Sequence, residues 1–566
     1  MKLLTLTSSF ALMATLSFGQ IGINDKYFNF DDNTTDEATT GYDLSINSLT
    51  KAGDEKYLIT FSSYGKYRNQ DVRGGVLRIN PDGSIDQEFM ANRGNGASFG
   101  TQKAFRDGNG KYIILGTFSN FNDNNCRGIV RLNADGSVDN TFNAGTGFAS
   151  TLYGNNFNLK SIVQLSNGKY LIGGAFDSYN GQTVRNLALI NSDGTLDTSF
   201  SGTEGDLNSI TSLYRDGSKI LVAGNLTTIN GQLAAGQTGA RRLVRLNMDL
   251  TIDNSFSYTH HGITNDIAKI GDEYVLVGNN LGQAQNRNIL LVNSDGSINS
   301  DFNQGTGITG GAEAVVVRYT SGEGDLIYVG GTMSAYNGTA VGGIMALKRD
   351  GTLHSSSTTT AGFSGGLVRA LHVDQQYNRL LAGGSFTHYD NEVRTGLASL
   401  SHCSAISPVD FDVDDEYITY QNGVLSTTSD WDSYIQWVNC DGDVPVDDAR
   451  GYSFTPTVNG SYKAIHYADC IYETECITVA NVGIDEVASE DFKVYPNPSN
   501  GILNITLPSV QDLTTITVYD LVGKVTFTQT VANTDQVKLS LNDAKGIYTV
   551  EVKTASSTST KRVVIE

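Results

Sequence analysis

Residues Gly168 to Phe200 read GKYLIGGAFDSYNGQTVRNLALINSDGTLDTSF, and this stretch decides the fold. It contains an apolar strand with a Gly-Gly pair, an Asn-Gly turn, a second apolar strand and an Asp-Gly turn. Seven copies fill the chain from about residue 57 to residue 402. Repeats of this length with several short strands each are typical of radial repetition. The sequence therefore predicts an all-β chain with a seven-bladed β-propeller.

The apolar residue before the Asp-Gly turn aligns the copies, at intervals of 46 to 58 residues. These residues are Ile79, Leu132, Ile190, Leu246, Val292, Leu347 and Leu400. Glycine supplies the positive φ of a tight hairpin turn. In the fourth copy Leu250 takes the place of this glycine, so we expect that turn to be built differently.

The seventh copy ends at LASLSHC, residues 397–403, and lacks the Asp-x-x-Phe tail that follows most other turns. The segment Asp25 to Asn29 (DKYFN) matches Asp139 to Asn143 (DNTFN) at the end of the second copy. We expect the N-terminal segment to supply the last strand of the final blade. Such pairing removes an open sheet edge, which would otherwise favour aggregation.

The cassette resembles the delta-60 repeat family of β-propellers over residues near 21–403. That resemblance implies a fold and no assigned activity. Glycine pairs such as Gly173-Gly174 suit close backbone approach near the propeller axis. Residues repeated in every copy serve the fold, so a functional site must be sought among residues that the copies do not share.

Composition excludes several partners. The chain has 60 acidic and 39 basic residues and a net charge of −21, which disfavours nucleic acid and anionic lipid. Lys2, the apolar run Leu3 to Phe18 and the small residue Gly19 predict a signal peptide over residues 1–19. No later stretch is apolar and long enough for a transmembrane segment. The repeats then occupy residues 20–403.

Residues 404–480 differ from the repeats and contain predicted strands at 434–440, 460–466 and 475–479. This segment resembles small Ig-like β-sandwich modules of secreted Bacteroidetes proteins, with Trp437 as the core aromatic residue. An exported chain permits disulfides, and four cysteines allow three connectivities that the sequence leaves open. The disulfide candidates are Cys403, Cys440, Cys470 and Cys476.

An acidic linker at residues 481–491 precedes a last domain at 492–566, a predicted small β-sandwich. Its ordered blocks are VYPNPSNG, ITVYDLVGK, GIYTVEV and the ending KRVVIE. They resemble the type A C-terminal sorting domain of the type IX secretion system. The resemblance implies the outer-membrane secretion machinery as partner and an outer cell-surface or secreted location. The motif residues are Tyr495, Pro496, Asn497, Pro498, Gly501, Tyr519, Asp520, Gly523, Lys524, Gly546 and Tyr548.

Calcium is the one cofactor that the turns suggest, since Asn133, Asp135 and Asp139 overlay part of an EF-hand loop. Arg131 and Phe142 stand where that loop needs carboxylates, so we interpret these side chains as turn-forming. The chain has no Gly-x-Ser-x-Gly elbow and no His-Glu-x-x-His motif.

These patterns predict a propeller that acts as a non-catalytic binding or adhesion module for an unknown glycan or protein. The alternative is a polysaccharide hydrolase or lyase with carboxylates at the propeller mouth. Blade asymmetry discriminates the two. The irregular segments are Gln232 to Arg241 and Gln283 to Arg287.

Overall fold

The computed structural model of the chain describes residues 23–25, 28 and 44–566, with internal gaps. The gaps are residues 54, 63, 69, 152–155, 205–208, 227, 234–240, 260–261, 282–287, 303–304, 321–323, 358–361, 402–417, 428–433, 468–470, 481–491, 542–544 and 555–557. The contacts divide the chain into two compact units, Met1–Thr455 with Gly460–Thr478, and Pro456–Asn459 with Val479–Glu566. The predicted signal peptide lies outside the described residues. Among the described residues no helix is long and apolar enough to cross a membrane.

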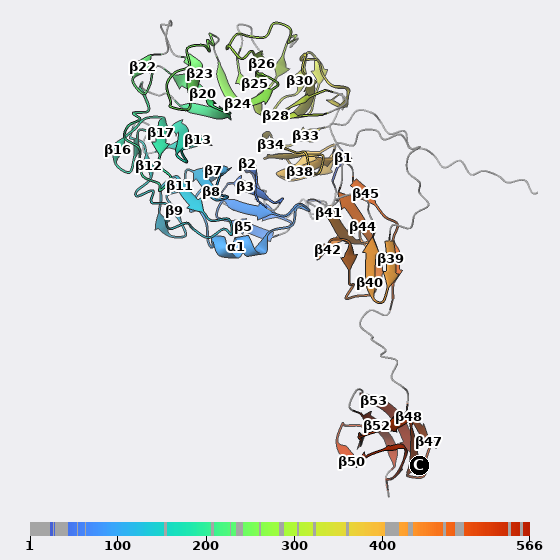
Figure 1. Cartoon of the computed structure of the whole chain (residues 1–566). Helices are drawn as coiled ribbons and strands as arrows, with labels where there is room; N and C mark the ends of the chain where they lie inside the picture. The colour runs from blue at the N-terminus through green and yellow to red at the C-terminus, as the bar shows by residue number, and fades with distance from the viewer. Residues whose placement is uncertain are drawn as a thin grey trace, which may run out of the picture. The chain divides into compact units, whose positions relative to one another are not determined.

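The first unit is built from antiparallel sheets in which a middle strand lies between a first and a third strand (Figure 1). The first strands are β2 (Ile46–Lys51), β7 (Thr101–Arg106), β13 (Asn158–Gln164), β19 (Ile210–Asp216), β24 (Ile263–Ile270), β28 (Ala312–Arg318) and β34 (Val368–Asp374). The middle strands are β3 (Tyr57–Phe61), β8 (Tyr112–Gly116), β14 (Tyr170–Ala175), β20 (Lys219–Leu226), β25 (Glu273–Asn279), β29 (Leu326–Gly331) and β35 (Arg379–Gly384). The third strands are β6 (Val76–Ile79), β11 (Ile129–Leu132), β17 (Leu187–Ile190), β23 (Arg241–Asn247), β26 (Ile289–Val292), β32 (Ile344–Lys348) and β38 (Leu397–Ser401).

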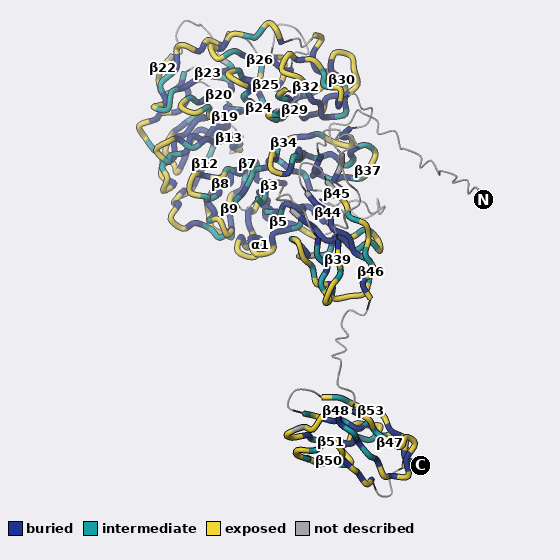
Figure 2. The backbone as a smooth tube through the Cα atoms, turned by 45° about the vertical axis from the view of Figure 1, so that its right-hand side comes forward, coloured by how far each residue is buried: buried dark blue, intermediate teal, exposed yellow. Residues whose placement is uncertain are grey.

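The first strands form a closed ring, because each contacts the next and β34 contacts β2. The middle strands are almost wholly buried, whereas the connections between sheets are largely exposed (Figure 2). This arrangement confirms the predicted all-β propeller fold. It also shows a strand that the sequence patterns did not single out, namely the first strand of each sheet.

The N-terminal segment closes the last sheet. Strand β1 (Ile23–Asn24) pairs antiparallel with β38, giving the order β1-β38-β35-β34. Phe28 is fully buried, and the Arg379 guanidinium lies 5.0 Å from the centre of its ring. In the second copy Arg131 lies 4.8 Å from the ring of Phe142. The match between the N-terminal segment and the Asp-x-x-Phe tail is therefore confirmed by contacts.

The Gly-Gly pairs lie on middle strands and face two different neighbours. A Cβ atom on Gly173 would lie 2.4 Å from Ile210 of the next sheet. A Cβ atom on Gly174 would lie 2.3 Å from the carbonyl oxygen of Asn158, at the start of its own first strand. Both contacts are too close for any side chain, so the pair packs a middle strand against the ring of first strands.

The expectation that the Leu250 turn is built differently is wrong. Leu250 adopts φ of 64°, and its N–H donates to the Asn247 carbonyl at 3.0 Å. Gly136 makes the same bond to Asn133 at 3.0 Å in the second copy. A leucine in this left-handed region is strained. Its side chain is buried in a core cluster, and this burial offsets the strain.

The Asp-x-x-Phe tail becomes a helix in the first copy. Helix α1 (Gln87–Arg93) is N-capped by Asp86, whose side chain accepts a hydrogen bond from the Phe89 N–H at 3.2 Å. A short 3₁₀ helix, η2 (Ser355–Ser357), takes this place after β32.

Small sheets of two or three short strands lie around the ring. They include β4 (Tyr64–Tyr67) with β5 (Gln70–Arg73) and β9 (Asn120–Phe121) with β10 (Asn124–Asn125). Three-stranded examples join β12 (Phe148–Ala149), β15 (Ser178–Tyr179) and β16 (Gln182–Thr183), and likewise β18 (Thr203–Glu204), β21 (Thr228–Ile229) and β22 (Gln232–Leu233). Two more join β27 (Ile308–Thr309), β30 (Ala335–Tyr336) and β31 (Thr339–Ala340), and β33 (Phe363–Ser364), β36 (His388–Tyr389) and β37 (Glu392–Val393).

The segment after the ring forms two further sheets. One has the order β39 (Ile418–Gln421), β40 (Val424–Thr427), β43 (Ser453–Phe454). The other has the order β42 (Val444–Arg450), β41 (Tyr434–Asn439), β44 (Gly460–Tyr467), β45 (Ile471–Glu473), with β46 (Ile477–Val479) also on β44. Trp437 is fully buried and its Nε1 donates to the Gly451 carbonyl at 2.9 Å, as expected of a core aromatic residue.

The second unit also contains two sheets. Their orders are β47 (Lys493–Tyr495), β48 (Ile502–Gln511), β51 (Thr534–Ser540) and β50 (Val525–Val531), β49 (Thr514–Tyr519), β52 (Gly546–Lys553), β53 (Thr558–Ile565). One apolar cluster joins both sheets, with Leu503 and Ile505 from the first and Val518 and Val550 from the second. The blocks VYPNPSNG, ITVYDLVGK, GIYTVEV and KRVVIE begin on β47, β49, β52 and β53.

Candidate functional site

Every first strand carries a β-bulge at the same place, where one residue is left out of the ladder to the middle strand. Bulges redirect side chains and are enriched beside functional sites. Here all the bulge residues line one cavity of about 810 Å³ inside the ring. They are Asn47, Gln102, Lys160, Thr211, Asn265, Glu313 and Arg369. The cavity, termed the axial cavity below, is thus built from residues that share a position but not a chemical type.

The residue after each bulge also lines the axial cavity, and several of these residues fasten neighbouring sheets together. Ser48 Oγ accepts a hydrogen bond from Ala104 N at 3.1 Å, and Ser161 Oγ accepts one from Leu213 N at 3.0 Å. Asp266 Oδ2 takes the same role toward Val315 N at 3.0 Å. A serine therefore suffices to accept the hydrogen bond from the neighbouring sheet, and this structural role does not require the carboxyl group of Asp266.

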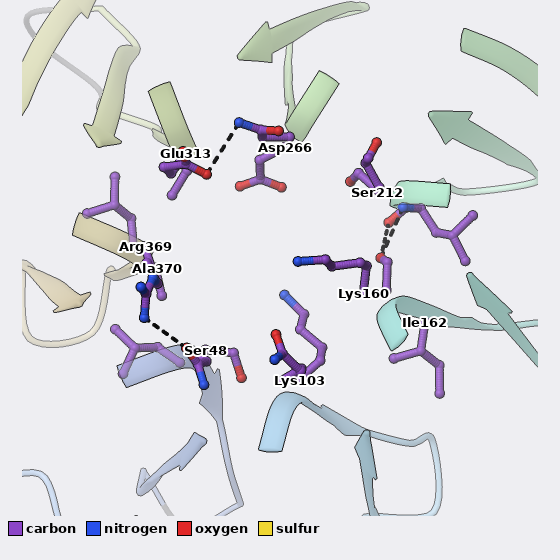
Figure 3. Close-up of a pocket in the computed structure, with 18 of the residues that line it drawn as sticks. Ser48, Lys103, Lys160, Ile162, Ser212, Asp266, Glu313, Arg369 and Ala370 are labelled. Carbon is purple, nitrogen blue, oxygen red and sulfur yellow. Dashed lines mark hydrogen bonds between the residues drawn. The ribbon is translucent and has the colours of Figure 1, made fainter. Parts of the chain in front are cut away.

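Five charged side chains break the symmetry of the ring (Figure 3). Lys103 and Lys160 extend from β7 and β13 toward the middle of the cavity, and Arg369 comes from β34. Asp266 and Glu313 come from β24 and β28 on another part of the wall. Among the described residues, these five side chains form no ion pair with one another.

The two carboxyl groups of the cavity are stabilised in their neutral forms. Loss of hydration raises the pKa of Asp266, against a smaller opposite effect of the Lys103 charge. Loss of hydration likewise raises the pKa of Glu313, which the charges of Lys160 and Arg369 partly oppose. Raised carboxyl pKa values are common at ligand-binding and catalytic sites.

The loops that suggested calcium use their oxygens within their own repeats. Asp135 Oδ1 accepts hydrogen bonds from Ser137 N at 2.9 Å and Ser137 Oγ at 2.7 Å. Asp139 Oδ2 forms ion pairs with Lys111 Nζ at 2.7 Å and Arg131 Nε at 2.6 Å. These contacts agree with the turn-forming interpretation of both side chains.

The axial-cavity residues were not identified from the sequence. The irregular segments that the sequence indicates, residues 232–241 and 283–287, lie largely outside the described residues. The asymmetry that the structure describes lies instead on the first strands. A comparison of the first-strand residues between copies would have revealed it, because Lys160, Glu313 and Arg369 replace neutral residues at the bulge position.

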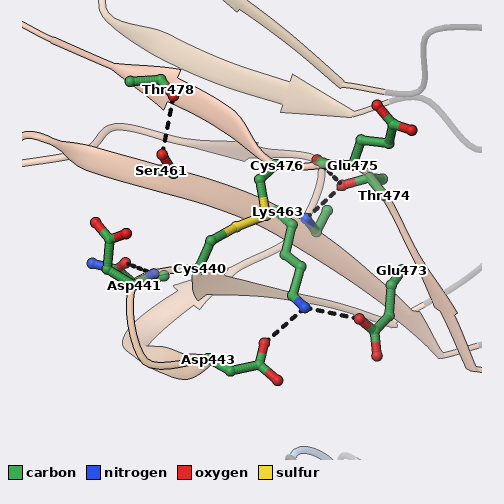
Figure 4. Close-up of a disulfide and its surroundings, with 12 residues drawn as sticks. Cys440, Asp441, Asp443, Ser461, Lys463, Glu473, Thr474, Glu475, Cys476 and Thr478 are labelled. Atoms are coloured by element: carbon green, nitrogen blue, oxygen red, sulfur yellow. Dashed lines mark hydrogen bonds and ion pairs between the residues drawn. A yellow bond between two sulfur atoms is a disulfide. The ribbon is translucent and has the colours of Figure 1, made fainter.

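Cys440 and Cys476 form a disulfide between β41 and the start of β46, with Cα atoms 6.4 Å apart (Figure 4). Lys463 Nζ lies close by and contacts Asp443 at 2.7 Å and Glu473 at 2.8 Å. Cys403 and Cys470 lie outside the described residues. Cys126 in the ring is a free thiol, and burial raises its pKa to about 11.

The first block of the predicted sorting motif contacts the last strand of the chain. Asn497 accepts a hydrogen bond from Val564 N at 2.8 Å and donates one to the Arg562 carbonyl at 3.0 Å. Gly501 has φ of 96° and its carbonyl accepts from Leu541 N at 2.8 Å. The first block of the motif is thereby fastened to β53 and to the end of β51. Tyr495, Pro496 and Pro498 beside it are exposed.

The other motif blocks shape turns and one strand contact. Asp520 Oδ1 accepts from Val522 N at 3.0 Å and Lys524 N at 2.9 Å, and Gly523 has φ of 79°. These bonds form the predicted hairpin turn between β49 and β50. Tyr519 donates to Glu551 at 3.1 Å. Gly546 and Tyr548 lie on β52 beside the last strand.

Solved structures give distant likenesses. A protein of unknown function from Dyadobacter fermentans DSM 18053 is 11% identical, with 64% of this chain and 95% of that chain covered and a TM-score of 0.29. A putative exported protein from Bacteroides fragilis NCTC 9343 is 12% identical, with 68% and 97% covered and a TM-score of 0.28. No curated protein matches the chain.

Family models match both parts of the chain. The family described as "Domain of unknown function (DUF5122) beta-propeller" matches residues 60–89, 108–142, 165–200 and 218–256. The family described as "Secretion system C-terminal sorting domain" matches residues 493–566. Such a tail directs export by type IX secretion to the cell surface or the medium, and implies contact with that machinery. The chain therefore carries β-propeller repeats that match the DUF5122 family between residues 60 and 256, and a secretion-system C-terminal sorting domain at residues 493–566.

Proposed function

We propose that the exported chain is a binding or adhesion protein whose propeller holds a glycan or protein group in the axial cavity without chemical turnover. The observation that carries this proposal is the division of labour in the ring. The repeated Asp, Arg and Lys residues are paired inside their own sheets, as in Lys111–Asp139 and Arg131–Asp139. In the part of the ring that the structure describes, five charged residues that differ between sheets line one cavity without forming ion pairs with one another.

We also propose the domain boundaries 20–403 for the propeller, 404–480 for an Ig-like spacer, 481–491 for a linker and 492–566 for the sorting domain. Two changes along the chain support these boundaries. The repeated sheets give way to the sheet that contains β39 and β40, and this segment is followed by the separate apolar cluster of the second unit. In this arrangement the spacer carries the propeller and the sorting domain serves export.

A second candidate is a polysaccharide hydrolase or lyase. The observation that favours it is the placement of two carboxyl groups with raised pKa, Asp266 and Glu313, in the same cavity. A raised pKa favours the protonated form of a carboxyl group, and this is the form that acts as a general acid in glycoside cleavage.

One experiment separates the candidates. The mature full-length chain is screened on a glycan array, and the same polysaccharides are assayed for newly released sugar ends. Binding without release supports the binding protein, and release that Asp266→Ser abolishes supports the enzyme. If the array and the release assay are both silent, a glycan role is excluded.

A further inference from the structure

The charges of the axial cavity are sorted by sign along the ring. The lysines lie on the adjacent strands β7 and β13, and the carboxyl groups lie on the adjacent strands β24 and β28. We propose that the axial cavity binds a zwitterionic ligand, with its acidic group against Lys103 and Lys160 and its ammonium group against Asp266 and Glu313. The proposal rests on the proposed binding function and specifies the ligand.

The lysines are available for a ligand. Within the part of the chain that the structure describes, neither Lys103 nor Lys160 forms an ion pair or donates a hydrogen bond from Nζ. Arg369 differs, since its Nη1 donates to Ser45 Oγ at 2.9 Å and to Asn47 Oδ1 at 3.2 Å. The basic wall therefore consists of two ammonium groups that nothing on their own wall satisfies.

The carboxyl groups are held by neutral donors. Asp266 accepts from the backbone N–H groups of Ile267 at 2.9 Å and Val315 at 3.0 Å. Glu313 accepts from Asn265 Nδ2 at 3.3 Å. No described cation reaches either group with an ion pair, so an ammonium group of a ligand would supply the missing opposite charge.

Three cations, Lys103, Lys160 and Arg369, and two carboxyl groups line the same cavity, and this mixture of signs favours a ligand with both charges over a purely acidic one. The whole chain has a net charge of −21, which would repel a simple polyanion before it reached the cavity. A cavity of about 810 Å³ holds a mono- to trisaccharide or a short peptide end. A sugar that carries both an amine and a carboxylate and a short free peptide with both its ends present the same zwitterionic chemistry.

The ring supplies substitutions that its own fold already tolerates. Asp266→Ser introduces the residue type that Ser48 and Ser161 provide at the same position of two other sheets. Glu313→Asn likewise introduces the residue type of Asn47 and Asn265. On the other wall, Lys103→Ser and Lys160→Thr take the residues of Ser48 and Thr211. Each change removes a charge and keeps a small polar side chain at the bulge or directly after it. Lys66→Gln, on an exposed position of β4, is the matched control.

Isothermal titration calorimetry of the full mature chain uses four probes. Muramic acid carries an amine and a carboxylate, glucosamine only the amine and glucuronic acid only the carboxylate, and diglycine is a non-sugar zwitterion. We expect at least one zwitterion to bind about tenfold or more tighter than either singly charged sugar, which corresponds to about 1.4 kcal/mol. Variants of either wall should remove this advantage, and Lys66→Gln should keep it.

The outcomes separate this proposal from the binding function. If glucuronic acid binds as tightly as muramic acid and the acidic-wall variants change nothing, the zwitterion proposal is overturned while binding stands. If only diglycine binds, the zwitterion stands and the glycan source is excluded. If neither zwitterion binds, the proposal falls, and the glycan array then decides on binding by itself.

Discussion

At the residue scale, the repeated aspartates carry charge for the fold. Asp197 forms an ion pair with Lys169, and its Oδ1 accepts from Ser199 N at 2.9 Å and Ser199 Oγ at 2.7 Å. The Lys169 hydrogen bond is the largest cause that lowers the pKa of Asp197, to about 2. The same pairing recurs at Asp139 and Asp253, so it belongs to the repeat and not to a site.

We predict that the propeller loses stability as the pH falls from about 4 to 2. Folding lowers the pKa of Asp197 from its unfolded value near 3.9, so the unfolded chain takes up protons first and stability falls with pH. Asp197→Asn should cost about 1 kcal/mol at pH 7 and nothing near pH 2. Urea unfolding followed by circular dichroism at both pH values tests this. Asp301→Asn, at an exposed position, is the control, and an equal cost of the two changes at pH 7 contradicts the prediction.

At the element scale, the N-terminal segment closes the ring through its side chains as well as through β1. Phe28 is fully buried in the cluster that includes Leu44, Tyr57 and Leu397. We predict that Phe28→Ala destabilises the propeller by about 3–5 kcal/mol, because a large buried side chain is lost. Phe99→Ala serves as control, since Phe99 is 64% exposed. Equal urea midpoints for the two variants would show that the segment does not hold the ring shut.

The disulfide gives a second prediction at this scale. It joins residues 36 positions apart, so its removal by Cys440→Ser with Cys476→Ser should cost the segment from β39 to β46 about 2–4 kcal/mol. Both tryptophans of the chain, Trp431 and Trp437, lie in this segment, so their fluorescence during urea unfolding reports on it alone. Cys126→Ser in the ring should leave that transition unchanged. An unaltered midpoint in the double variant contradicts a structural disulfide.

Elements differ in how far the sequence predicts them. Middle and third strands repeat their apolar residues, and Asp-Gly turns mark their ends, so the propeller fold and the N-terminal closure follow from pattern. The first strands share geometry without sharing residues, since a bulge position accepts Asn47, Lys160 or Glu313 equally well. The axial cavity is built from those positions, and only the folded ring shows that they face one another. The prediction of a different turn at Leu250 fails for a related reason, because burial of the leucine side chain overrides the local preference for glycine.

At the scale of the whole molecule, two parts of the chain meet different demands. The ring uses repetition for stability, and residues that vary between its sheets line one cavity, as the proposed binding function requires. What distinguishes the second unit is the contact between its motif and its own last strand. Export and binding can therefore be tested by separate changes in one chain.

The last prediction concerns export. Deletion of residues 493–566 should leave the chain in the periplasm, because this segment is the sorting domain.

A finer change is Asn497→Ala, which removes both hydrogen bonds to β53 and should lower the stability of the second unit by about 1–2 kcal/mol. If the machinery reads the assembled end of the domain, this variant should also reduce the amount of protein at the cell surface, measured by protease accessibility of intact cells. Asn500→Ala changes an exposed residue of the same block and should be exported normally. Normal export of Asn497→Ala despite its lower stability would show that the machinery reads the motif sequence itself, without need of its contact to the last strand.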